Sequence, residues 1–128
     1  SRSLLEVAKW LAKSNGLPLV VAPVRPTRKQ EFLDTPMDAY LKMTDERGRI
    51  FDPWIRTHLE LGAELLNICQ NSVVITASFK RWKLWLGVDL DKTEEFTPPL
   101  GLAKLEVDPA NRRATYREPN VWMRYRVS

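Results

Sequence analysis

The sequence contains one histidine, His58, which is the side chain best suited to transfer a proton near neutral pH. His58 follows Trp54 by four residues, so the two side chains share one face of a helix. A lone histidine can instead pack or cap locally, and this interpretation has equal weight. The pattern therefore indicates either acid–base chemistry or a structural role at this position.

The residues around His58 predict the helix that positions it. Asp52 is suited to the N-cap, because its carboxylate can accept the free N–H groups of the first turn. Pro53 suits the first helical position, where no N–H is needed. Gly62 supplies the left-handed residue that ends a helix. We therefore expect a short helix over residues 53–61.

A basic cluster of Arg25, Arg28 and Lys29 directly follows the apolar run 17–24. In open α/β sheets, ligands bind beyond the carboxyl ends of the strands, where such a cluster could hold a phosphate or a carboxylate. A solvated loop explains the same residues equally well. The pair at 112–113, two arginines in a predicted hairpin turn, is expected to be solvated.

The apolar pattern along the chain predicts an α/β domain. Residues 3–15 have the spacing of an amphipathic helix, and the run 17–24 predicts a central strand that is buried on both faces. A long connection over 25–50 follows, with a short helix over 37–43. Further along, we expect strands over 72–77, 103–107, 113–117 and 121–127, a helix over 78–86, a loop over 88–99, and a turn at 108–111. The segment Glu118–Pro119–Asn120 predicts a strand-entry turn, with polar groups in a site as the alternative.

Composition limits the classes of protein. The length of 128 residues suits one domain, and the hydrophobic fraction of 44% is that of a globular protein. No apolar run approaches the roughly 20 residues of a membrane span, so no membrane partner is expected. The single cysteine, Cys69, excludes an internal disulfide and indicates a reducing, cytoplasmic location.

The sequence lacks the motifs of three kinds of functional site. One histidine and one cysteine cannot build a tetrahedral metal site, and the sequence contains neither a glycine-rich phosphate loop nor a G-x-S-x-G nucleophile motif. The net charge of +4 permits an anionic ligand such as a nucleotide or CoA, but the basic residues form no stripe for nucleic acid. We therefore expect no metal and no nucleic-acid partner.

The order of these elements, with Leu61–Gly62–Ala63 closing the capped helix, resembles the C-terminal half of the GCN5-related N-acetyltransferase superfamily. The segments 22–27, 52–56 and 118–123 are similar to those of a little-characterised bacterial acetyltransferase-like subgroup. The resemblance implies an acyl-CoA N-acyltransferase-like fold, in which helices flank a mixed sheet. It also implies transfer of an acyl group from a CoA thioester, such as acetyl-CoA, to an amine or another nucleophile.

The resemblance implies roles for individual residues on two of the predicted helices. His58 stands where many members have a tyrosine that protonates the departing CoA thiolate, and Asp52 lies near the asparagine that begins the same helix. These two residues are the catalytic candidates. Ser1, Arg2 and Ser3 would form the helix N-terminus that receives the CoA pyrophosphate, where free N–H groups favour an anion.

A small-molecule acceptor would lie beside Arg25, Lys29, Trp54 and Arg56. The superfamily's first strands and its pyrophosphate loop would precede Ser1, so residues 1–128 are expected to be the C-terminal part of a larger fold. An exposed edge strand would then pair with the N-terminal half or with a second copy. The alternative function is a non-catalytic module that binds CoA, another anion or a protein.

Overall fold

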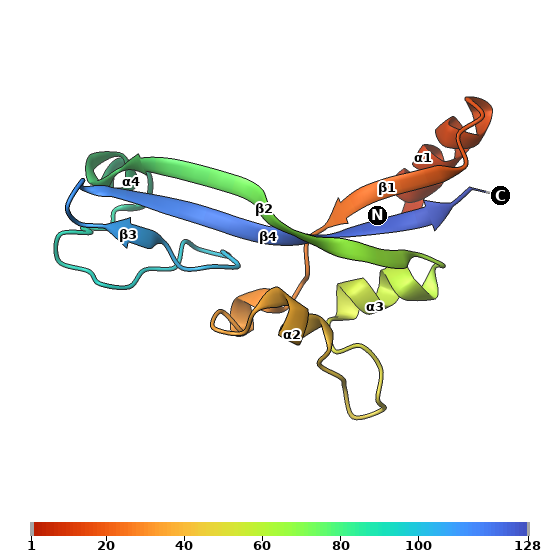
Figure 1. The fold of residues 1–128 in the computed structure, drawn as a ribbon, viewed down its shortest axis with the longest axis horizontal. Coiled ribbons are helices and arrows are strands. Elements are labelled where there is room, and N and C mark those ends of the chain that lie inside the picture. The colour runs from red at the N-terminus through yellow and green to blue at the C-terminus, as the bar shows by residue number, and fades with distance from the viewer. Residues whose placement is uncertain (1, 128) are drawn as a thin grey trace.

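The sheet is organised around one strand, β4 (Arg113–Arg126), in the computed structural model, which describes residues 2–127 and the side chains of residues 4–127 (Figure 1). β1 (Leu19–Val24) and β2 (Glu64–Ser78) flank this strand, and β3 (Glu106–Asp108) also pairs with it. Each of these pairings is antiparallel, whereas the resemblance implied a mixed sheet.

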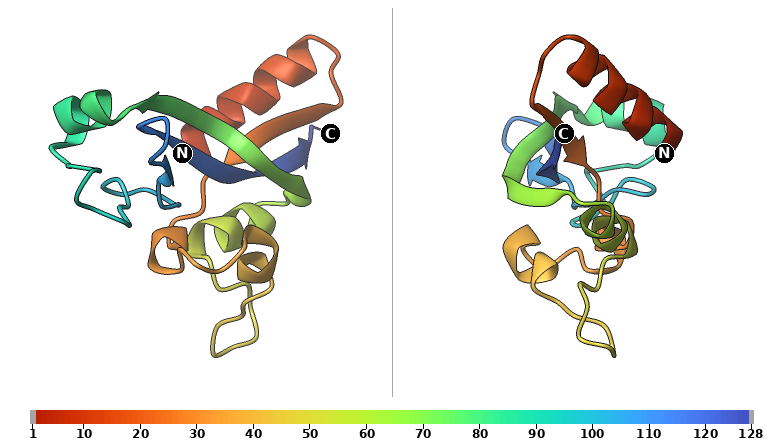
Figure 2. Two further views of the ribbon diagram at one scale, coloured as in Figure 1. Left: turned by 60° about the vertical axis from the view of Figure 1, so that its left-hand side comes forward. Right: turned by 90° about the vertical axis from the view of Figure 1, so that its right-hand side faces the viewer.

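Helices flank this sheet, which confirms the α+β fold class. The described residues form α1 (Arg2–Ser14), α2 (Met37–Leu41), α3 (Pro53–Glu60) and α4 (Phe79–Leu86), and a 3-10 helix, η1 (Lys29–Glu31). α1 lies beside β1 at one end of the sheet, α4 and β3 lie at the other end, and α2 and α3 lie below (Figure 1, Figure 2). The helices predicted over 3–15, 53–61 and 78–86 are confirmed to within one residue at each end.

β1 is an edge strand, which corrects the prediction of a central strand. Among the described residues it pairs only with β4, from Leu19 opposite Arg126 to Val24 opposite Val121. Val21 keeps 48% of its surface exposed, whereas Val24 keeps 4%. An apolar run indicates that both faces of a strand can be buried, but it does not reveal which neighbouring strands are present.

β4 runs unbroken through Glu118–Pro119–Asn120, where the sequence predicted a turn between two strands. Pro119 has no N–H to donate to a neighbouring strand. The partner strand adapts, because Glu118 pairs with Val73 and Asn120 with Cys69, which leaves extra residues of β2 in a bulge. The predicted turn was wrong because this bulge accommodates the proline within one long strand.

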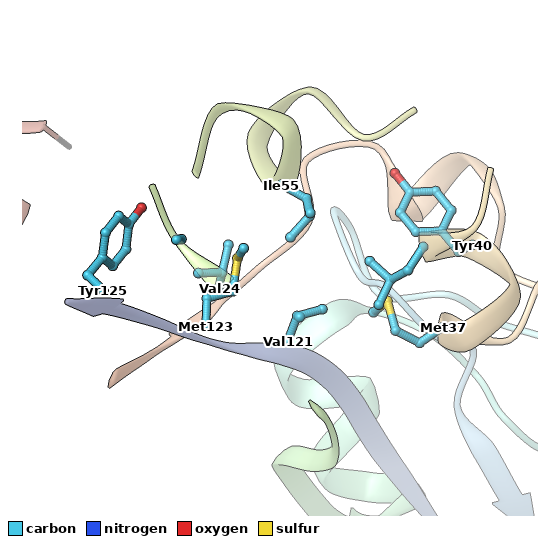
Figure 3. Packing of buried hydrophobic residues seen from close by; sticks show 9 residues of the cluster. Val24, Met37, Tyr40, Ile55, Val121, Met123 and Tyr125 are labelled. Atoms are coloured by element: carbon cyan, nitrogen blue, oxygen red, sulfur yellow. The ribbon is translucent and has the colours of Figure 1, made fainter. Parts of the chain in front are cut away.

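The buried side of β4 changes in the middle of the strand. Even-numbered residues are buried from Ala114 to Asn120, and odd-numbered residues from Val121 to Tyr125. Successive side chains of a strand point to opposite faces, so the two halves of β4 bury opposite faces. One half packs with α4 in a first core. The other half packs with α2 and α3 in a second core, shown in Figure 3, which includes Val24, Met37, Tyr40, Ile55 and Met123.

Candidate active site

Asp52 fixes the start of α3. Its Oδ1 accepts hydrogen bonds from the backbone N–H groups of Trp54 and Ile55, each at 3.0 Å. Its Oδ2 accepts one from the N–H of Arg28 at 3.1 Å and another from the hydroxyl of Tyr40. The carboxylate thereby ties the first turn of α3 to the 25–50 connection and to α2.

These contacts keep Asp52 ionised. The residue is 1% exposed, and burial by itself raises the pKa of the carboxyl. The hydrogen bonds from Tyr40, Ile55 and Arg28 outweigh this effect, so the pKa of Asp52 lies below its usual value. Burial, and then the contact with Asp52, raise the pKa of Tyr40, whose hydroxyl therefore remains a donor.

The lowered pKa of Asp52 predicts a loss of stability in acid. The folded chain binds this proton more weakly than the unfolded chain, so the carboxylate stabilises the fold fully above the unfolded pKa of about 4. The contribution is lost as the pH falls through the folded pKa. Urea unfolding from neutral pH to about pH 2 is expected to show the stability difference between wild type and Asp52→Asn shrinking. A difference that does not change with pH would contradict this.

His58 lies on α3 with one ring nitrogen engaged and the other without a partner. Its Nδ1 is in hydrogen-bond contact with the hydroxyl of Tyr125 on β4. Its Nε2 is buried and has no hydrogen-bond partner among the described residues. The imidazole packs edge-on against Trp54, with ring centroids 4.5 Å apart and an interplanar angle of 77°. Because buried polar atoms are rarely left unpaired, this nitrogen is a candidate for proton transfer to a ligand.

The surroundings of His58 keep its ring neutral. Burial lowers the pKa of His58 below its usual value, so the imidazole carries no charge at neutral pH. Burial also raises the pKa of Tyr125, which keeps its hydroxyl proton. In the tautomer whose Nδ1–H donates to the Tyr125 oxygen, Nε2 has a free lone pair and can accept a proton.

A hollow of about 310 Å³ lies between α1, β1 and α3, and we call it the His58 hollow. Its walls are mostly apolar. The structure brings three residues that the sequence had singled out, Arg25, Trp54 and His58, to its lining. Apolar side chains from α1 and β1 complete much of the wall, among them Leu5, Ala8, Val20, Ala22 and Val24.

Lys29 and Arg56, two of the predicted acceptor residues, are not among the residues that line the His58 hollow. Lys29 is buried, which lowers its pKa, and its ammonium donates to the carbonyl of Phe32 at 2.7 Å. Arg56 donates to the carbonyl of Ile50 at 2.9 Å and pairs with Asp45 at 3.2 Å. Both cations therefore hold the 25–50 connection in place.

Two of the predicted CoA-binding residues, Arg2 and Ser3, lie at the start of α1. Ser1 is outside the described residues, as are the side chains of Arg2 and Ser3. α1 begins at Arg2, and its residues Leu5 and Ala8 line the His58 hollow. The helix thus leads from the predicted pyrophosphate position to the hollow.

Tyr125 is a site residue that the sequence did not single out. The alternating pattern over 121–127 predicts a strand and places Tyr125 on its apolar side. The pairing of Val20 with Tyr125 shows that this side faces the same hollow as β1. Only the register between distant strands brings the hydroxyl to His58.

Further findings concern metal sites, membrane spans and the thiol. Within residues 2–127, no group of three or more histidine, cysteine or acidic side chains is placed to hold a metal ion. No helix in this part of the chain combines the length and the apolar character needed to cross a membrane. Cys69 is a free thiol of intermediate exposure.

The architecture is that of an acyltransferase-like α+β fold, with a histidine-bearing helix beside a hollow. No family model matches the chain. Over 94% of its length, the chain is 31% identical to the arginine N-acetyltransferase avaD of Aspergillus versicolor, and the match covers 48% of that protein. The chain therefore spans about half the length of this relative. The similarity supports an acetyltransferase relationship, whereas the predicted bacterial subgroup has no support from this fungal protein.

Proposed function

We propose that this chain is the C-terminal half of an N-acetyltransferase of the GCN5-related type, which transfers an acetyl group from acetyl-CoA to a small amine. The observation that carries the proposal is the buried, unpartnered Nε2 of His58 on a helix that lines a hollow. The similarity to an arginine N-acetyltransferase supports the class of reaction. The single cysteine supports a cytoplasmic location.

In the proposed reaction, the amine nitrogen attacks the thioester carbonyl carbon. A C–N bond forms and the C–S bond breaks. Neutral His58 accepts at Nε2 the proton that the amine nitrogen loses, and it returns this proton to the departing CoA sulfur. The products are an N-acetylated amine and CoA with a free thiol. Orientation of the two substrates in one hollow contributes the remaining acceleration.

The other predicted residues either line the hollow or hold the segments around it in position. Trp54 and Arg25 line the hollow and would contact the acceptor. We assign Asp52 a positioning role in place of a catalytic one, because donors within the protein engage both of its oxygens. Lys29 and Arg56 would act indirectly, by holding the connection that precedes α3.

An N-terminal half is proposed to cover α1 and β1. Val7 and Trp10 share one face of α1 and are 53% and 65% exposed, and Val21 on the edge strand is 48% exposed. A strand added beside β1 would bury these side chains and bring a pyrophosphate loop to residues 1–3. The match covers 48% of the relative, so that protein has further sequence outside the matched part. A second copy of the chain is the alternative partner.

The proposal is tested by incubating the complete protein with acetyl-CoA and a panel of small amines that includes arginine. We expect a thiol reagent to detect free CoA, and mass spectrometry to detect the acetylated amine. Thermal melting with and without acetyl-CoA separates binding from chemistry. A raised melting temperature without thiol release would overturn the proposal in favour of a non-catalytic binding module.

A further inference from the structure

A second hollow, of about 430 Å³, lies between α4, β4 and the loop 98–101, and we call it the Glu118 hollow. Arg25 lines both this hollow and the His58 hollow, so the two meet at its side chain. Trp82, Trp85 and Tyr116 give the Glu118 hollow an aromatic lining. An acceptor placed across Arg25 would therefore reach both hollows.

Glu118 supplies a fixed negative charge to this hollow. The side chain is 9% exposed, and its Oε1 accepts a hydrogen bond from the Tyr116 hydroxyl at 2.6 Å. Arg25 approaches the same carboxylate at 3.3 Å through Nε and Nη2, longer than the about 2.7–2.9 Å of a strong charge-assisted bond. The Arg25 side chain is 45% exposed. Arg25 Nη2 also donates to the Leu100 carbonyl at 2.5 Å, so the loop holds the guanidinium as well. The carboxylate is thus buried, whereas its cationic partner is half open to water and makes only long contacts with it.

The loop next to this carboxylate packs tightly against Tyr116. The Tyr116 hydroxyl that donates to Glu118 also accepts a hydrogen bond from the N–H of Leu102 at 3.0 Å. A Cβ atom at Gly101 would lie 2.8 Å from the Pro98 carbonyl oxygen and 3.3 Å from the Tyr116 ring, so only glycine fits there. The loop, the tyrosine and the carboxylate therefore form one connected site.

We infer that the Glu118 hollow binds a cationic nitrogen group of the acceptor, a guanidinium or an ammonium, at the end of the acceptor away from the acetylated amine. The ligand's cation takes the position on Glu118 that the Arg25 guanidinium now occupies. Trp82 and Trp85 pack edge to face, and Trp85, which lines the hollow and is 49% exposed, is the indole that a cation can reach. This inference rests on the proposed function, since it names the substrate class of the same reaction.

The test compares arginine with citrulline, which replaces the guanidinium by a neutral group of the same shape. Calorimetry on the complete protein without acetyl-CoA is expected to show arginine binding about tenfold or more tightly than citrulline. Glu118→Gln keeps the shape of the side chain and is expected to reduce this preference to about twofold or less. The matched control is Glu106→Gln, an exposed carboxylate on β3 that pairs with Arg117 at 3.2 Å, and it should keep the preference.

A second variant covers the case in which Glu118→Gln does not fold. Trp85→Leu changes a half-exposed residue at the hollow and is expected to weaken arginine binding about threefold, with little effect on citrulline. Equal binding of the two ligands to wild type, or an unchanged preference in Glu118→Gln, would overturn the inference. A preference for arginine without CoA thiol release would refute the proposed function and leave the cation site standing.

Discussion

Replacing His58 with glutamine is expected to lower kcat for acetyl transfer by about a hundredfold to ten-thousandfold, while the Kd of acetyl-CoA changes little. The amide of glutamine can keep the contact with the Tyr125 hydroxyl, but it cannot exchange a proton near neutral pH. The variant thereby separates the chemistry of the imidazole from its packing. Release of CoA thiol under saturating substrates measures the effect.

The pH dependence of kcat distinguishes a catalytic base at position 58 from a purely structural residue. The reaction needs neutral imidazole, so wild-type kcat should fall as the pH drops through the His58 pKa, which lies below the usual 6.5. This fall of kcat at low pH, the acid limb of the profile, should be missing in the glutamine variant. Tyr125→Phe is the matched control, because it removes the hydroxyl but keeps the base, and it should lose less activity and retain the limb. Glutamine at position 58 with wild-type kcat would rule out the catalytic role.

Asp52→Ala is expected to reduce the free energy of unfolding by about 3–5 kcal/mol, because it removes the N-cap of α3 and leaves buried donors without an acceptor. The donors are the N–H groups of Trp54, Ile55 and Arg28 and the hydroxyl of Tyr40. Asp52→Asn keeps one acceptor oxygen for the cap and should lose about 1–2 kcal/mol. Urea unfolding with an unchanged m-value measures both losses.

The control for this prediction is another aspartate in the first turn of a short helix. Asp38 is the second residue of α2 and is exposed, and its carboxylate accepts only the N–H of Ala39, at 2.9 Å, among the described residues. Asp38→Ala should therefore change stability by no more than about 0.5 kcal/mol. A loss for Asp52→Ala as small as that of the control would show that water replaces the carboxylate in the folded protein.

The sequence predicts the elements whose signals are local. The N-cap, the proline and the stop glycine of α3 lie within eleven consecutive residues, 52–62, and the structure confirms the helix they define. Gly87 ends α4 in the left-handed conformation, again as its position predicts. Such signals act through backbone groups a few residues away, so distant neighbours do not alter them.

The errors concern features that depend on distant partners. The edge position of β1 and the unbroken path of β4 through Pro119 are set by strands elsewhere in the chain. The same holds for the site, because the His58–Tyr125 contact joins residues 67 apart in sequence and the Arg25–Glu118 contact joins residues 93 apart. The sequence could name His58 and Arg25 as candidates, but it could not name the side chains that meet them.

The central place of β4 also determines when the fold can form. Each of the other described strands pairs with β4, which is the last of them to leave the ribosome. The sheet therefore cannot begin to assemble until nearly all of residues 2–127 have been synthesised, and folding is governed by contacts between distant segments, which is slow. Until then β1 and β2 expose unpaired edges to other chains. A truncation before β4 would thus abolish the sheet as a whole, since the other described strands pair with β4 and not with one another.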